Sequence, residues 1–104
     1  MIGPLQGDVW WAQADDKRRP VLIVTRSDAI PVLSRVVVAP VTRTVRSIPT
    51  EVPLSPDDGL PVDCAASFDN LQPIGRELLS ERIAALDPAR RHEICRALAA
   101  LGDC

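Results

Sequence analysis

The sequence predicts a small, mainly antiparallel β-barrel (class α+β) that carries an α-helix at its C-terminus. Five or six short apolar runs, separated by turn residues, follow one another over most of the chain. Strands do not alternate with helices, and the one clear helical pattern comes at the end. Short strands in series favour antiparallel pairing. A length of 104 residues suits one compact domain, so we expect a single domain over residues 1–104.

The first half of the chain predicts three strands. Residues 7–13 form a first strand opened by a glycine turn, and residues 14–19 form a polar connection. A second strand covers residues 20–25, because proline is tolerated at the first position of a strand. Its continuous β-branched run indicates burial on both faces. The third strand covers residues 35–42, and Pro40 predicts that it is an edge strand or carries a bulge.

The second half continues with shorter strands joined by clear turns. An exposed basic loop over residues 43–49 leads to a strand at residues 50–54. Dense turn residues over 55–61 separate it from a short apolar strand at residues 64–68. Residues 81–86 read as a last strand, although their two consecutive alanines would also suit a helix.

A C-terminal helix is predicted from residue 87 onward. Asp87 is a suitable N-cap, and Pro88 fits the first helical position. Apolar residues then recur at helical spacing, and a glycine occupies the position of a C-terminal cap. These residues are Ile94, Leu98, Leu101 and Gly102.

Charge is distributed unevenly along the chain. The net charge is −2, which argues against a protein that coats polyanions in general. Residues 1–50 nevertheless hold seven basic and four acidic residues, whereas residues 51–104 hold five basic and ten acidic ones. No acidic residue lies between Asp28 and Glu51. This asymmetry predicts a local basic surface for an anionic partner.

The cysteines and the hydropathy pattern exclude several classes. Three cysteines without a C-x-x-C spacing, Cys64, Cys95 and Cys104, predict neither a zinc site nor a disulfide framework. The sequence has no signal peptide and no apolar run near 18 residues, so we expect a cytoplasmic protein with no membrane contact. His92, the only histidine, is expected to face solvent on the terminal helix.

Four polar residues at predicted strand ends are candidates for chemistry. Arg19 precedes a buried strand, and its guanidinium can bind a phosphate through two hydrogen bonds. Thr42 ends the third strand, where its hydroxyl could donate to a phosphate oxygen. Asp69 follows a short apolar strand and could act as a general base, with Glu51 as a weaker candidate. The simpler alternatives are a surface charge, an ordinary strand threonine, a turn residue and an outward strand residue, respectively.

Four segments, taken in order along the chain, resemble the MazF/PemK-type toxins of toxin–antitoxin systems. The resemblance extends over nearly the whole chain. It implies an SH3-like barrel that forms a homodimer and cleaves single-stranded RNA without a metal or cofactor. It also implies a cognate antitoxin whose extended tail covers the active site. The segments are Gly7–Trp10, Arg19–Val24, Val36–Thr42 and Ile48–Val52.

The same resemblance suggests roles for individual residues. Arg19 and Thr42 match active-site positions, and Asp69 looks like the acidic residue that some members use in catalysis. Those members carry an arginine two residues earlier, where this chain has Ser67. The group that transfers protons therefore stays open between Asp69 and Glu51. RNA contacts are expected from six residues: Arg18, Arg43, Thr44, Arg46, Glu51 and Asn70.

The implied reaction uses the 2′-hydroxyl of the RNA as nucleophile and leaves a 2′,3′-cyclic phosphate and a 5′-hydroxyl. Arg19 would stabilise the phosphorane charge and Thr42 would orient the phosphate. Two other functions are compatible with the same barrel. One is a non-catalytic toxin that binds DNA gyrase, and the other is an RNA-binding module that does not cleave.

Overall fold

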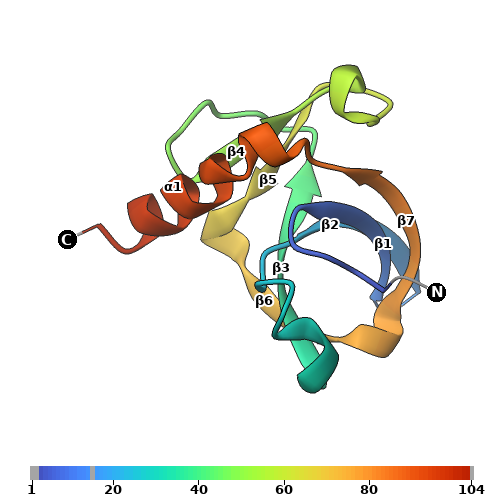
Figure 1. The fold of residues 1–104 in the computed structure, drawn as a ribbon. Coiled ribbons are helices and arrows are strands. Elements are labelled where there is room, and N and C mark those ends of the chain that lie inside the picture. The colour runs from blue at the N-terminus through green and yellow to red at the C-terminus, as the bar shows by residue number, and fades with distance from the viewer. Residues whose placement is uncertain (1–2, 15, 104) are drawn as a thin grey trace.

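The computed structural model describes residues 3–14 and 16–103 and shows a curled antiparallel sheet with one helix beside it (Figure 1). Short 3₁₀ turns join several of the elements. The strands and the helix are β1 (Asp8–Ala14), β2 (Lys17–Ile23), β3 (Arg35–Thr42), β4 (Glu51–Leu54), β5 (Cys64–Ser67), β6 (Gln72–Gly75), β7 (Leu79–Ala85) and α1 (His92–Leu101).

The sheet follows the order β4-β5-β3-β2-β1-β7, and β6 pairs with the first half of β3. Every strand pair is antiparallel. The strands curl into a half-barrel, and α1 lies across its outside next to β4 and β5 (Figure 1). The predicted fold class, a small antiparallel barrel with a C-terminal helix, is confirmed. No helix within the described ranges has the length and apolarity needed to span a membrane.

Both faces of the central strands are buried, as their continuous apolar runs predicted. In β2, Leu22 enters a larger apolar cluster, whereas Val21 and Ile23 enter a smaller one on the other face. β3 alternates in the same way, with Ala39 in the larger cluster and Val38 in the smaller one. This is the period-two alternation of side chains along a strand. The helix closes the larger cluster with Ile94 and Ala97.

The path of β3 determines where the two halves of the sheet separate. β3 pairs with β2 as far as Val21 opposite Pro40, and from Val41 onward it pairs with β5. The prediction that Pro40 marks an edge strand is wrong, because β3 lies between β2 and β5. Proline has no backbone N–H, so it is tolerated where the ladder to β2 ends.

Several element boundaries differ from the sequence predictions. β2 begins at Lys17, so most of the predicted polar connection is strand and pairs with β1 in a tight hairpin. β6 was not predicted, and it pairs with residues 35–38. β7 confirms the last strand and excludes the helical alternative. Asp87 caps a 3₁₀ turn at Pro88–Arg90, and the α-helix begins only at His92.

Candidate active site

Thr42 lies at the end of β3, in the segment that pairs with β5. Its Oγ1 accepts the backbone N–H of Thr44 at 3.1 Å. A hydroxyl that accepts one hydrogen bond can still donate its own proton. The Thr42 hydroxyl is therefore fixed by the start of the next loop and remains able to donate to an oxygen of a ligand.

Arg19 lies on β2 opposite Ala12 of β1, and its side chain is exposed. Continuing the β2–β3 register by two residues from the last pair, Val21 and Pro40, would set Arg19 opposite Thr42. Both residues therefore lie just beyond the last pair of the β2–β3 ladder, where the two strands diverge. Side chains alternate between the two faces of a strand, so Arg19 projects from the face of β2 opposite to that of its neighbour Pro20.

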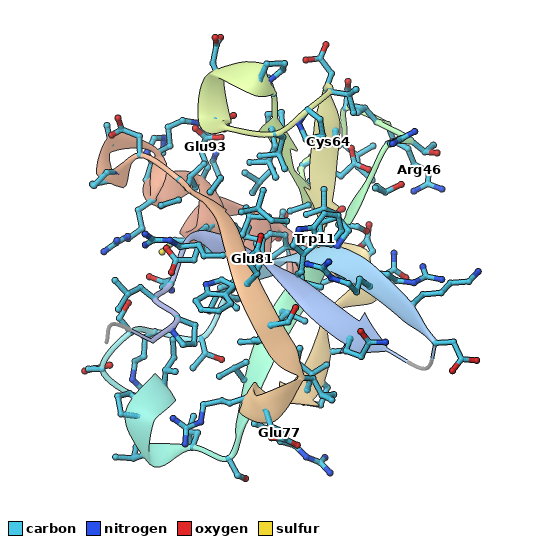
Figure 2. All side chains as sticks on the ribbon, turned by 90° about the vertical axis from the view of Figure 1, so that its right-hand side faces the viewer. Trp11, Arg46, Cys64, Glu77, Glu81 and Glu93 are labelled. Carbon is cyan, nitrogen blue, oxygen red and sulfur yellow. The ribbon has the colours of Figure 1, made fainter. Side chains whose placement is uncertain are left out.

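A cavity of about 320 Å³ occupies this point of divergence. Pro20 of β2 and Thr42 of β3 lie on its two sides, and Arg43 follows Thr42 in the wall. Trp11 and Cys64 both line it, and Figure 2 shows Trp11 near the centre of the molecule with Cys64 above it. No acidic side chain is among the described residues that line it. The full lining is Trp11, Pro20, Val41, Thr42, Arg43, Leu60, Pro61, Val62, Cys64 and Ile83.

Two arginines lie at this cavity, since Arg43 lines it and Arg18 lies over Trp11, whereas Arg19 and Arg46 are not part of its lining. Arg18, Arg19, Arg43 and Arg46 are all exposed. None of them forms an ion pair with a residue in the described part of the chain. Arg18 instead lies over the ring of Trp11, with its guanidinium carbon 4.9 Å from the ring centroid. Guanidinium groups without a carboxylate partner, beside an acid-free cavity, suit the binding of a phosphodiester.

The predicted residues Asp69 and Asn70 lie in a 3₁₀ turn after β5 and do not line the cavity. Asp69 Oδ2 accepts the hydroxyl of Thr50 at 2.6 Å. The Asn70 side-chain amide donates to Ser67 Oγ at 2.9 Å. Both side chains therefore make contacts within the protein, and their roles in catalysis and RNA binding stay predictions.

Glu51 is buried, with 8% of its surface exposed, and it holds the loop over residues 43–50. Its Oε1 accepts the backbone N–H groups of Arg46 at 2.9 Å and Ser47 at 3.2 Å. Its Oε2 is buried without a hydrogen-bond partner among the described residues. The alternative that Glu51 is an outward strand residue is wrong. The sequence carried no signal for these contacts, which join a strand to a loop without regular structure.

The sequence also gave no functional role to Trp11 or Cys64. The only signal for Trp11 was its place beside Trp10, which puts the two rings on opposite faces of β1. Cys64 is buried, and burial raises the pKa of its thiol, with Asp63 and Asp58 acting in the same direction. The thiol is therefore protonated at neutral pH.

The remaining candidate groups lie apart from this site. His92 is exposed on α1, and its Nδ1 lies 3.0 Å from the carbonyl oxygen of Ala89. Within residues 3–14 and 16–103, no three His, Cys, Asp or Glu side chains gather as metal ligands would. Cys104 lies outside the described residues.

Comparison with known proteins identifies the family. Residues 5–102 match the family described as the PemK-like, MazF-like toxin of type II toxin–antitoxin systems. The chain belongs to the MazF-like toxin family. A relative in Mycobacterium tuberculosis, named probable endoribonuclease MazF5, is 39% identical over 103 residues, covering 97% of this chain and 94% of the relative.

Solved structures of MazF-like toxins share the fold. The Mycobacterium tuberculosis toxin MazF-mt6 has a TM-score of 0.84 and 38% sequence identity, covering 92% of this chain and 96% of the other. A mycobacterial endoribonuclease in complex with its cognate antitoxin has a TM-score of 0.83 and 30% identity, covering 95% and 94%. The family resemblance deduced from the four sequence segments is therefore confirmed, and with it the enzyme class, a MazF-like endoribonuclease.

Proposed function

We propose that this MazF-like toxin cleaves single-stranded RNA at the cavity between Pro20 and Thr42, without a metal or cofactor. In this reaction the 2′-oxygen attacks the adjacent phosphorus while the bond from phosphorus to the 5′-oxygen breaks. The 2′-hydroxyl loses its proton to a base, and the leaving 5′-oxygen gains one. The products are a 2′,3′-cyclic phosphate and a 5′-hydroxyl. The observation that carries the proposal is a cavity whose described lining holds no acidic side chain, with the fixed Thr42 hydroxyl and Arg43 in its wall and Arg18 over Trp11.

Each of the three predicted catalytic residues supplies one part of this chemistry. Arg19 stabilises the negative charge of the phosphorane, since fixed cations in a site commonly contribute the largest catalytic effect. Thr42 donates its hydroxyl proton to a phosphate oxygen. Asp69 assists proton transfer when RNA is bound. A guanidinium donates hydrogen bonds and has no acceptor atom, so Arg19 is a poor general base.

The partners follow from the same proposal. RNA is the substrate, and a cognate antitoxin inhibits the toxin by covering the cavity with an extended segment. A mycobacterial endoribonuclease of the same fold has been solved in complex with its antitoxin, which supports this part. The toxin acts as a homodimer in the cytoplasm and slows growth by destroying RNA.

The test is incubation of the purified protein with defined single-stranded RNA in excess EDTA, followed by mass spectrometry of the ends. We expect cyclic-phosphate and 5′-hydroxyl ends. Thr42→Val, which keeps the shape and loses the hydroxyl, should cleave about 10²–10³-fold more slowly. Thr42→Ser should retain most of the activity. Arg19→Ala should be impaired to a similar degree, and Arg19→Lys should recover only part, because lysine lacks the planar fork.

Three outcomes would contradict the proposal. Cleavage by Arg19→Ala and Thr42→Val that is as strong as that of the wild type would show that the active site lies elsewhere. RNA that is bound and left intact would indicate a binding module. Toxicity in cells that survives Arg19→Ala, together with inhibition of DNA gyrase, would indicate the non-catalytic toxin.

A further inference from the structure

The cavity beside Thr42 is mainly apolar and has one aromatic wall. Apart from Thr42 and Arg43, its lining consists of apolar side chains and the protonated thiol of Cys64. Trp11 is the one aromatic residue in it. A phosphate would bind to the polar residues at the rim of such a cavity. The apolar interior is therefore available to another part of the ligand.

Trp11 differs from its neighbour Trp10 in what it contacts. Trp10 packs against the smaller core cluster, and its indole N–H donates to Asp8 Oδ2 at 3.2 Å. Trp11 is half-buried, and its indole N–H has no hydrogen bond to any residue in the described ranges. One tryptophan is thus fixed in the core, whereas the other presents its ring to the cavity.

The Trp11 ring is covered by a planar cation, the guanidinium of Arg18. Trp11 pairs with Pro20 across the hairpin, and Arg18 follows diagonally on the same face, 4.9 Å from the ring centroid. Aromatic rings and guanidinium planes are the two surfaces on which proteins stack unpaired RNA bases. Here both kinds of surface stand next to the phosphate-binding rim.

We propose that Trp11 and Arg18 form a nucleobase subsite, in which the base next to the cleaved phosphodiester stacks on Trp11 inside the cavity. Arg18 shifts from the indole to cover the outer face of the base, while Thr42 and Arg43 hold the attached phosphate. This inference rests on the proposed RNA cleavage. The cationic, acid-free rim favours a nucleotide over an apolar peptide side chain as occupant.

The first experiment combines protein variants with altered substrates. RNA substrates each carry one abasic residue, at successive positions around the cut, and are cleaved by the wild type and by Trp11→Leu. We expect Trp11→Leu to lower kcat/KM on intact RNA about 10- to 100-fold. At one position, the abasic residue should lower kcat/KM of the wild type by a similar factor. The same abasic residue should lower kcat/KM of Trp11→Leu only slightly further. Trp11→Phe keeps a ring and should recover most of the loss, and Trp10→Phe is the matched control.

Arg18 is tested with two substitutions that separate charge from stacking. Arg18→Lys keeps the charge, whereas Arg18→Ala removes it. If Arg18 covers the base, removing that base should slow cleavage by Arg18→Lys much less than cleavage by the wild type. The loss of this effect should be nearly as large in Arg18→Lys as in Arg18→Ala. If Arg18 acts only by its charge, Arg18→Lys should behave as the wild type, and its part of the proposal would be overturned.

A binding measurement separates this inference from cleavage itself. In Trp10→Phe, Trp11 is the only tryptophan. Its fluorescence is followed during titration with RNA whose 2′-hydroxyl at the cut is replaced by hydrogen, so that cleavage is blocked. Quenching by intact oligomer and not by the abasic one is the expected result. Quenching with no cleavage of normal RNA would support the subsite while the proposed function fails.

Two results would overturn the subsite. One is that the two losses are independent, so that Trp11→Leu on abasic RNA shows the product of the two separate decreases in kcat/KM. The other is fluorescence that ignores RNA but responds to an apolar peptide, which would assign the cavity to a protein partner.

Discussion

The carboxylate of Glu51 accepts the backbone N–H of Ser47, the one non-glycine residue with a positive φ in the described part of the chain. The φ of Ser47 is 55°, a left-handed conformation that costs free energy in a residue with a side chain. Together with the hydrogen bond from Thr44 to Thr42, this contact fixes the start and the middle of the basic loop at residues 43–50.

Replacing Glu51 should therefore loosen the loop and destabilise the protein. Glu51→Ala removes the acceptor of two N–H groups and leaves a cavity, so we expect a loss of about 2 kcal/mol in the free energy of unfolding. Amide hydrogen exchange at Arg46 and Ser47 should become faster. Urea denaturation and exchange measured by NMR check the two effects separately.

Glu51→Gln is the matched variant for this prediction. It keeps one carbonyl oxygen for the two N–H groups and removes a buried charge whose Oε2 has no partner among the described residues. The glutamine variant should thus be clearly more stable than the alanine variant and keep slow exchange at Ser47. Equal exchange rates in both variants would show that Glu51 does not hold the loop.

Loop arginines should contribute to RNA affinity through salt-dependent contacts. Arg43→Ala and Arg46→Ala should each lower the slope of log K against log salt concentration by about 0.7, the value for one phosphate contact on a single strand. Fluorescence anisotropy with uncleavable RNA measures this slope. Arg26, which pairs with Asp28 at 3.3 Å, is the control residue. An equal change in Arg26→Ala would mean that the effect is only one of net charge.

The fold was largely predictable from the sequence because its central strands are buried on both faces. Continuous β-branched runs gave the positions of β2 and β3, and turn residues separated the later strands. The start of β2 was missed because Lys17, Arg18 and Arg19 pair through their backbones and bury no side chain. β6 was missed because Pro73 and Gly75 weaken its strand pattern.

The candidate site was only partly predictable. Arg19 and Thr42 were proposed because the apolar runs beside them are visible in the sequence, and the structure places Thr42 in the cavity wall. The cavity beside Thr42 depends on β3 changing partners at Pro40, and the roles of Trp11 and Glu51 depend on contacts between separate elements. A single sequence does not reveal such contacts, because local patterns describe one element at a time.

The two described cysteines should differ in reactivity. Cys64 is 4% exposed and burial raises its thiol pKa, whereas Cys95 is exposed on α1. The thiolate is the species that alkylating agents attack. Iodoacetamide near neutral pH should therefore modify Cys95 at least about tenfold faster than Cys64. Peptide mass spectrometry over time gives both rates, and faster labelling of Cys64 would contradict the buried position of its thiol.

An acid-sensitive contact should anchor the start of α1 to the barrel. Glu93 forms two hydrogen bonds with Arg90, at 2.8 Å to Nε and 2.9 Å to Nη2, and these lower the pKa of the Glu93 carboxyl. Arg90 also donates to Asp58 Oδ1 and to the carbonyl of Pro53, each at 2.6 Å. The network thus joins the helix to β4 and the turn after it.

Because the pKa of Glu93 is lower in the folded than in the unfolded state, its contribution to stability is complete above the ordinary glutamate pKa of about 4.3. It disappears as the pH falls through the lowered folded value. Glu93→Gln should cost about 1 kcal/mol near pH 7 and progressively less below about pH 4.3. Urea denaturation over this pH range measures the difference, with Glu81→Gln on exposed β7 as the control. A constant difference from pH 7 down to about pH 3 would show that the ionised Glu93 carboxylate is not what stabilises the anchor.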